Sequence, residues 1–361
     1  MAGETLATHP LVAFMRDPER TAESLDTHGW EALLRAGRRA NLLSRAACMA
    51  ESLGILEQVP GRVAFHLRSA IRVAESGRLS TVREVRYIEQ AMVEADVHCI
   101  LLKGAAYVIA ALDAGRGRLL SDIDIMVPHA CLLDAETAFA RRGWMTTKLD
   151  AYDQRYYRQW MHELPPMRHL VRGTSLDIHH TILPPTARLK PDPLKLWAAA
   201  RPAAMTSRLK VLAPVDMILH SATHLFHEGE FDNGLRDLFD MHSLIREFSD
   251  EAGFWTSLLE RAVELDLERP LYYALRYCSG IIGTPVPEDV LRRSEHSMPS
   301  GAMRRVMDGL VVRSLGEVLT RHRTVASGVA QVSMYVRSHY LRMPARMLIP
   351  HLLRKQFISG R

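Results

Sequence analysis

The chain has 361 residues, of which 47% are hydrophobic and 24% charged, ordinary values for a globular protein with two or three compact units. Its four cysteines form no CxxC pair, which argues against a disulfide scaffold or a cysteine-built zinc site and indicates a reducing compartment. The N-terminus does not have the pattern of a signal peptide, and no apolar run approaches the ~20 residues of a membrane-spanning helix. We therefore expect a cytoplasmic protein that is not transmembrane.

The net charge of +5 is unevenly distributed. Residues 301–361 contain eleven Lys or Arg and two acids, whereas the rest of the chain has a net charge of −4. The basic, partly apolar tail from Met334 to Phe357 has the composition of a segment that binds an anionic membrane surface or a nucleic acid. The alternative is a pair of C-terminal helices that pack on the body and expose a basic face, and we favour this second interpretation.

In chain order, the first predicted elements are helices. Apolar residues between Trp30 and Asp96 recur at steps of three and four, the spacing of one helical face. Gly54, Pro60–Gly61 and Gly77 are the expected breaks between these helices. The sequence thus predicts an N-terminal helical region over residues 1–96.

Short apolar runs interleave with helical patterns in the next segment, residues 97–190. The expected strands are residues 98–102, 122–127, 144–149, 167–171 and 175–181. Helical patterns then return over residues 191–361, which end in the basic tail. This organisation predicts an α+β fold, in which a small mixed β-sheet core is flanked by N-terminal and C-terminal helical regions.

The motif Asp122-Ile-Asp-Ile-Met-Val127 is the strongest chemical signal in the chain. Side chains on a strand alternate between faces, so Asp122 and Asp124 point the same way while Ile123 points into the core. Two neighbouring carboxylates repel each other unless a cation lies between them, and a hard ion such as Mg²⁺ prefers such oxygen ligands. The alternative is one solvent-facing acid and one acid that caps the following helix.

Two further features of the sequence indicate a phosphate ligand and a third acid. Lys103-Gly104 ends one expected strand where a helix begins, and glycine together with helical N–H groups allows a phosphate to approach closely. On the later strand Leu176-Asp-Ile-His179, Asp177 and His179 share one face, and Asp177 would complete a two-metal site. Each feature taken alone has an alternative. Lys103-Gly104 could be an ordinary turn with a surface lysine, and Leu176–His179 could be a structural strand with a polar face.

Together these motifs resemble the nucleotidyltransferases of the DNA polymerase β-like superfamily. More closely, they are similar to a largely uncharacterised bacterial nucleotidyltransferase family, over roughly residues 80–250. The matching segments are Leu101-Leu-Lys-Gly104, Arg118, Asp122-Ile-Asp-Ile-Met-Val127, Gly143-Trp144 and Leu176-Asp-Ile-His179.

The resemblance implies transfer of a nucleoside monophosphate from a nucleoside triphosphate to an acceptor hydroxyl, with release of pyrophosphate and with two Mg²⁺ or Mn²⁺ ions. It implies that Asp122, Asp124 and Asp177 are the catalytic, metal-binding carboxylates. The residues expected to contact the nucleotide and its phosphates are Lys103, Gly104, Ala105, Arg118, Ser121 and His179. Ala105 replaces the usual serine or glycine of the superfamily, so Lys103 and Arg118 are expected to supply the missing phosphate contacts.

Several alternatives stay open at this stage. The acceptor is a small molecule, a peptide, a protein or a polysaccharide component, and a toxin-like transferase acting on tRNA is a variant of the same activity. A non-catalytic nucleotide-binding scaffold with the same fold is the alternative from another class. The spaced histidines His220 and His224 either form a second metal site or, as we expect, pair with a neighbouring helix on which Arg236 bonds to an acid.

Overall fold

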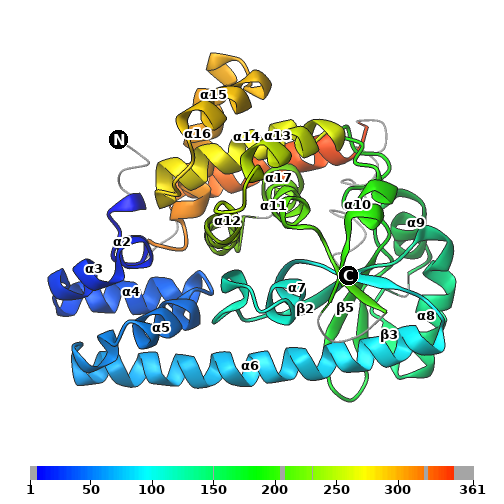
Figure 1. Ribbon diagram of the computed structural model, residues 1–361, viewed down its shortest axis with the longest axis horizontal. Helices are drawn as coiled ribbons and strands as arrows, with labels where there is room; N and C mark the ends of the chain where they lie inside the picture. The colour runs from blue at the N-terminus through cyan, green and yellow to red at the C-terminus, as the bar shows by residue number, and fades with distance from the viewer. Residues whose placement is uncertain (1–5, 149, 204–207, 230, 321–323, 345–361) are drawn as a thin grey trace.

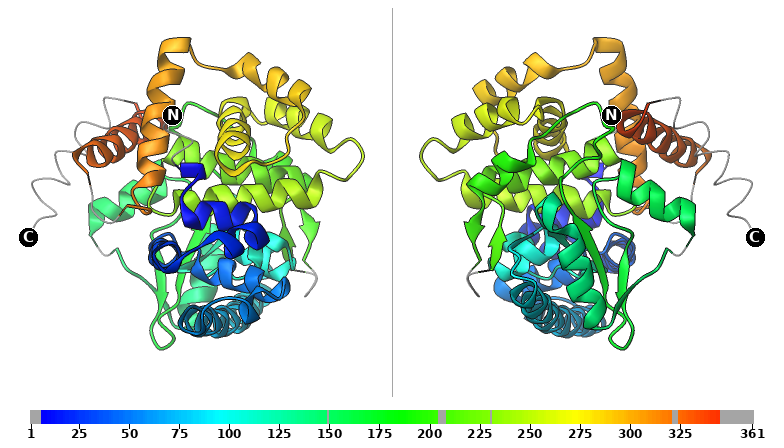
Figure 2. Two further views of the ribbon diagram at one scale, coloured as in Figure 1. Left: turned by 90° about the vertical axis from the view of Figure 1, so that its left-hand side faces the viewer. Right: turned by 90° about the vertical axis from the view of Figure 1, so that its right-hand side faces the viewer.

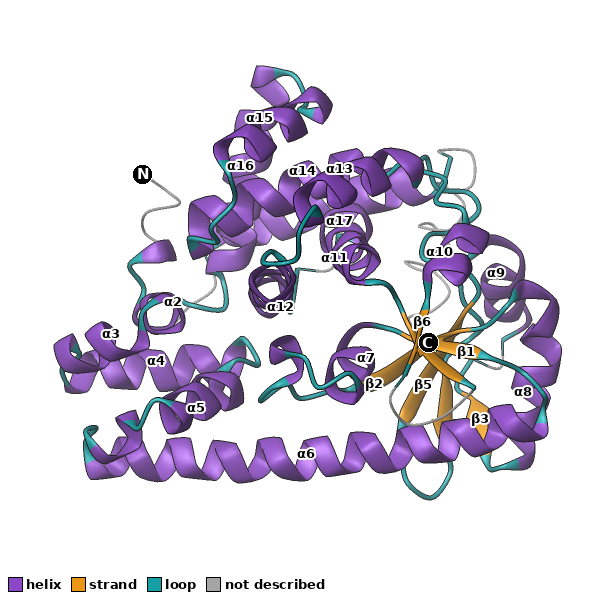
Figure 3. Cartoon of the chain, in the orientation of Figure 1, coloured by secondary structure: helices purple, strands orange, loops and turns teal. Residues whose placement is uncertain are grey.

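The computed structural model describes residues 6–148, 150–203, 208–229, 231–320 and 324–344. Helices make up most of this part of the chain, and one mixed sheet lies at one side of it (Figure 3). The α-helices are α2 (Pro10–Arg16), α3 (Pro18–Ser24), α4 (Thr27–Arg39), α5 (Leu43–Ser52), α6 (Gly61–Glu94), α7 (Lys103–Ile109), α8 (Leu132–Arg141), α9 (Ala151–Trp160), α10 (Pro193–Ala199), α11 (Pro214–Thr223), α12 (Gly234–Phe248), α13 (Phe254–Glu264), α14 (Glu268–Tyr277), α15 (Glu288–Ser294), α16 (Gly301–Gly316) and α17 (Val325–Arg342).

The sheet has the strand order β3-β4-β5-β2-β1-β7-β6. Its strands are β1 (Cys99–Leu101), β2 (Asp122–Met126), β3 (Trp144–Thr146), β4 (Met167–His169), β5 (Ser175–His179), β6 (Arg201–Pro202) and β7 (Leu209–Val211). The β2–β5 and β1–β7 pairs are parallel and the other pairs are antiparallel. The predicted α+β class is confirmed, and the sheet continues through β6 and β7 beyond the boundary expected at residue 190.

Helix α6 is the longest helix of the described structure and runs from the N-terminal helices to the sheet (Figure 1). It contacts α5 at one end and α7 and α8 beside the sheet. The break expected at Gly77 is wrong, because the helix passes through this residue without interruption. A Cβ at Gly77 would lie 3.2 Å from Leu119 Cδ2, so the glycine permits a close approach of the chain before β2. Packing along α6 offsets the low helix propensity of Gly77, which costs about 1 kcal/mol relative to alanine.

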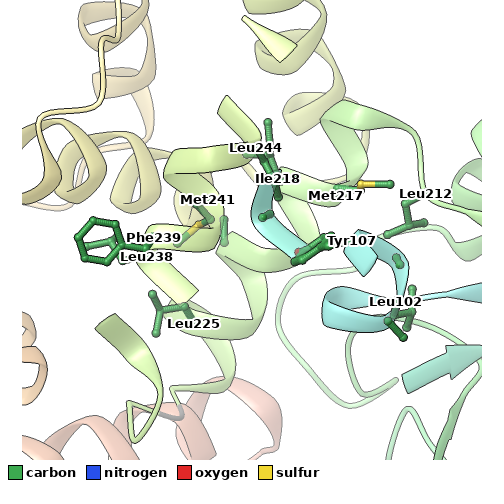
Figure 4. Packing of buried hydrophobic residues seen from close by; sticks show 14 of the residues in the cluster. Leu102, Tyr107, Leu212, Met217, Ile218, Leu225, Leu238, Phe239, Met241 and Leu244 are labelled. Carbon is green, nitrogen blue, oxygen red and sulfur yellow. The ribbon is translucent and has the colours of Figure 1, made fainter. Parts of the chain in front are cut away.

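The C-terminal helices cover the other side of α7, above α6 in Figure 1 and in the upper part of both views of Figure 2. Tyr107 of α7 is buried near Ile218 of α11, and Leu102, which precedes α7, is buried on the side of Leu212 (Figure 4). Helix α7 therefore packs against α11, and residues 113–115 after it pack against α12. This packing fixes the start of α7, where the predicted phosphate contacts lie.

None of the helices in the described ranges combines the length and the apolar character needed to cross a bilayer. Helices α16 and α17 pack against each other, and α17 also contacts the segment that follows α11. The remainder of the basic tail, residues 345–361, lies outside the described residues. Its binding to an anionic surface or a nucleic acid therefore stays a prediction.

Candidate active site

Strands β2 and β5 bring the predicted acids together. The two strands are parallel neighbours, and their register places Asp124 directly opposite Asp177. Ile123 and Ile125 are almost fully buried, so the alternation expected along β2 is confirmed. Because residues opposite each other in a sheet share a face, the Asp124 and Asp177 side chains lie side by side.

The acids line a cavity of about 190 Å³ at this face of the sheet. The predicted residues that border it are Lys103, Gly104, Arg118, Ser121, Asp122, Asp124, Asp177 and His179. The structure thus gathers residues from four separate motifs around one space. Ala105 does not border the cavity, since it is 1% exposed and packs within α7.

Asp124 is the most strongly paired acid in this cavity. Its Oδ1 atom lies 3.2 Å from Lys103 Nζ and 3.1 Å from His179 Nε2. Burial alone raises the pKa of Asp124, but the Lys103 ammonium and the His179 hydrogen bond outweigh burial and hold this pKa well below its usual range. Asp124 is therefore ionised. Lys103 reaches it from a left-handed backbone conformation with φ 45° at the first position of α7.

Asp177 has the opposite electrostatic environment. Its Oδ1 atom is buried and has no hydrogen-bond partner among the described residues. Burial, followed by the negative charges of Glu163, Asp124 and Asp122, raises the pKa of Asp177 to about 8. A buried carboxylate oxygen without a donor is costly, so this position suits a cation.

Asp122 and Ser121 lie at a more exposed part of the cavity wall. Ser121 Oγ donates a hydrogen bond of 3.0 Å to Asp122 Oδ1. The pair of acids on β2 therefore consists of an accessible carboxylate and a buried one, both bordering the same space.

Arg118 forms a buried ion pair that the sequence did not reveal. Its Nε atom lies 2.9 Å from Asp240 Oδ2 on α12, and Arg45 of α5 binds the other oxygen of the same carboxylate. The Arg118 side chain packs beneath Gly104, where a Cβ would lie 3.0 Å from Arg118 Cζ and 3.1 Å from Leu120 Cγ. Gly104 thus permits the start of α7 to rest on this ion pair, and the phosphate contact expected of Arg118 stays a prediction.

Gly104→Ala is expected to lower the free energy of unfolding by roughly 1–3 kcal/mol, because the added methyl group overpacks the contact with Arg118 and Leu120. Denaturant unfolding measures this change. Gly61→Ala is the matched control, since no atom lies within 4 Å of a Cβ at the start of α6. Equal stability of the two variants would contradict the tight packing inferred at Gly104.

Residues outside the recognised motifs also border the cavity. They are Leu120, Met161, His162, Glu163, His224, Asn233, Arg236 and Arg342. Arg236 bonds to Asp237 at 2.8 Å, and His224 Nδ1 lies 3.7 Å from Asp237 Oδ2. His224 thus contacts an acid of the neighbouring helix as expected, and Arg236 bonds to an acid of its own helix; the expected pairing of His220 stays a prediction. His162 and Glu163 had no periodic or motif signal in the sequence, because they belong to an irregular segment between α9 and β4.

The fold and the site define an α+β protein with a polar pocket, lined by acids and cations, beside the start of a helix. The chain belongs to a family described as uncharacterised nucleotidyltransferase, whose family model matches residues 26–283, from the N-terminal helices through the sheet and into the C-terminal helices. Family membership supports nucleotidyl transfer as the general activity. Neither the curated proteins nor the solved structures include a match to this chain.

Proposed function

We propose that the protein is a metal-dependent nucleotidyltransferase of the polymerase β-like type. It transfers a nucleoside monophosphate from a nucleoside triphosphate to an acceptor hydroxyl and releases pyrophosphate. The observation that carries this proposal is the register of β2 and β5, which places Asp124 opposite Asp177, while Asp122 borders the same cavity. Three acids from two parallel strands provide the donor set of a two-ion site.

The donor atoms suit Mg²⁺ or Mn²⁺. Carboxylate oxygens are preferred ligands of these hard ions, and Asp177 Oδ1 supplies one that no donor among the described residues satisfies. We assign Asp122 and Asp124 as the pair that holds both ions, with Asp177 as the further ligand of one ion. When bound, such ions activate the attacking hydroxyl and neutralise charge on the leaving pyrophosphate.

Cationic side chains border the same cavity and suit an anionic substrate. Lys103, Arg236 and Arg342 approach it from the start of α7, from α12 and from the end of α17. We assign the triphosphate to this part of the cavity, where Lys103 exchanges its contact with Asp124 for a phosphate oxygen. The N–H groups at the start of α7 point along the helix axis and favour the same negative charge.

The chain's own residues also account for the proton of the acceptor hydroxyl. Asp177 has two carboxylate oxygens, and we assign one of them to the ion and the other to acceptance of this proton. Most of the remaining catalysis is positioning, because the phosphoryl group and the hydroxyl must be aligned before they react. A small molecule, a peptide, a protein and a polysaccharide component all remain candidate acceptors.

Incubation with each labelled nucleoside triphosphate and Mg²⁺ or Mn²⁺ tests the proposal through pyrophosphate release and labelling of an acceptor or of the protein itself. Asp124→Asn is expected to reduce the rate by roughly 10²-fold or more, since it removes one metal-binding charge. Asp250→Asn is the control, because Asp250 is an exposed acid outside the cavity.

Two outcomes would contradict the enzymatic proposal. Wild-type protein that binds neither a divalent ion nor a nucleotide, and releases no pyrophosphate, lacks the proposed site. Tight nucleotide binding without turnover, unaffected by Asp124→Asn, would instead support the non-catalytic scaffold.

A further inference from the structure

A second group of metal-ligating side chains adjoins the three aspartates. His162, Glu163 and His179 each offer one ligand atom, and these atoms all lie within 4.8 Å of one another. His162 and His179 are buried, and Glu163 has an exposed side-chain fraction of 17%. No sequence motif joins the three residues, because two come from the segment after α9 and the third ends β5.

The backbone holds this group in place. Glu163 and His179 form an antiparallel bridge, so their side chains lie on the same face. The bridge is reinforced on both sides, where the N–H of His180 donates to His162 O at 2.9 Å and the N–H of Leu164 donates to Ile178 O at 2.8 Å. The three side chains therefore need no large rearrangement to converge on one point.

The spacing of the ligand atoms agrees with a shared ion. His179 Nε2 lies 3.6 Å from Glu163 Oε2. Two ligands of a tetrahedral ion with bonds of about 2.0–2.1 Å are separated by about 3.3 Å, so a small movement of either side chain closes the site. The rings of His162 and His179 face each other with centroids 5.1 Å apart.

We infer that His162, Glu163 and His179 form a binding site for one divalent transition-metal ion of the Zn²⁺ class, distinct from the carboxylate site for Mg²⁺ or Mn²⁺. Two imidazoles and one carboxylate favour such ions, whereas Mg²⁺ prefers oxygen ligands alone. With three protein ligands, the ion retains an open position toward the cavity that His162, Glu163 and His179 border.

The two sites are neighbours, and an ion bound to His179 Nε2 replaces the hydrogen bond between this nitrogen and Asp124. His179 Nε2 lies 3.1 Å from Asp124 Oδ1 and 3.6 Å from Glu163 Oε2, so one ring nitrogen faces two acids. Binding of the ion requires neutral imidazoles and displaces any proton that the ligating ring nitrogen carries into solvent. The inference does not depend on the proposed transferase activity, because it concerns binding of the metal alone.

Zn²⁺ titration of the full-length protein against a chromophoric chelator, in a large excess of Mg²⁺, tests the inference. Wild type is expected to bind one Zn²⁺ per chain that Mg²⁺ does not displace. Co²⁺ in place of Zn²⁺ should give the visible absorption of a site of low coordination number. Glu163→Gln and His162→Gln each remove a direct ligand and should weaken Zn²⁺ binding by roughly 100-fold or more, at least the loss typical of a residue that only orients a ligand.

Asp122→Asn is the matched control, since Asp122 belongs to the carboxylate site and not to the three ligands. This variant should keep the Zn²⁺ affinity of wild type while Mg²⁺ binding falls. Circular dichroism establishes whether each variant is folded. If replacement of the buried His162 unfolds the protein, Glu163→Gln still tests the inference, because it preserves side-chain shape. Displacement of Zn²⁺ by Mg²⁺, or wild-type Zn²⁺ affinity in both ligand variants, would overturn the inference.

The results separate the two proposals. Tight Zn²⁺ binding that depends on Glu163, in a protein without pyrophosphate release, supports the transition-metal site and contradicts the transferase. Nucleotidyl transfer with Mg²⁺ in a protein that binds no Zn²⁺ supports the transferase and contradicts the transition-metal site.

Discussion

Asp177→Asn should strongly reduce the rate of nucleotidyl transfer and, in the absence of divalent ions, make the protein more stable than wild type near pH 8. The loss of rate is expected to be roughly 10²-fold or more, because the variant lacks one of the three proposed metal-binding charges. The gain in stability follows from the buried and unpartnered Oδ1 atom, whose negative charge is unfavourable beside Glu163 and Asp124.

The direction of the pH dependence follows from the raised pKa of Asp177. The folded-state pKa of Asp177 is about 8, whereas the ordinary pKa of an aspartate is 3.8. The stability associated with the protonated carboxyl is fully present below about pH 4 and is lost as the pH rises through about 8. The asparagine variant has no such loss. Its advantage in free energy of unfolding should thus grow from about zero near pH 4 to at least about 1 kcal/mol near pH 8.

Urea unfolding between pH 4 and pH 9 with a chelator present measures this difference. Addition of Mg²⁺ should reverse it, since the ion stabilises wild type and binds the variant weakly. Asp250→Asn serves again as the control and should follow wild type at every pH. A variant that is less stable than wild type near pH 8 without metal would show that Asp177 is well satisfied in the folded protein, against the structure.

Asp240→Asn is expected to cause the largest loss of stability, about 3–5 kcal/mol, because it leaves two buried arginines without their counter-charge. Asp240 is 1% exposed and joins Arg118, before β2, to Arg45 of α5. The ion network therefore ties the N-terminal helices, the chain beneath Gly104 and helix α12 together. Its loss should also disturb the start of α7 and weaken nucleotide binding.

The control for this variant is Asp308→Asn. Asp308 binds Arg276 through both carboxylate oxygens, but the two side chains are 31% and 36% exposed. An ion pair that water reaches contributes about 0–1 kcal/mol, so the loss at this partly exposed pair should be several times smaller. Guanidinium unfolding of both variants measures the difference. Similar losses would mean that burial of the Asp240 network does not determine its contribution.

The sequence by itself predicted the local chemistry of the site. Strict alternation in Asp122-Ile-Asp-Ile placed both acids on one face, and the same period in Leu176-Asp-Ile-His placed Asp177 with His179. The fold class followed equally from short strands set between helical patterns. These features could be predicted because side chains alternate between the two faces of a strand with a period of two residues. A short run of consecutive residues shows this period.

Long-range packing decided the other features. The pairing of Asp124 with Asp177 depends on β2 and β5 being parallel neighbours in one register, and no local pattern specifies that choice. Similarly, α6 passes through Gly77, where Leu119 of a loop distant in sequence packs closely. The counter-ion of Arg118 is Asp240 of α12.

His162 and Glu163 join the site through a single bridge to β5 from an irregular segment. Sequence periodicity encodes the face of an element, whereas the neighbours that this face meets depend on burial of apolar surface summed over the whole chain. For this reason the sequence identified the acids, and the tertiary structure alone decided which cations, histidines and further carboxylate surround them.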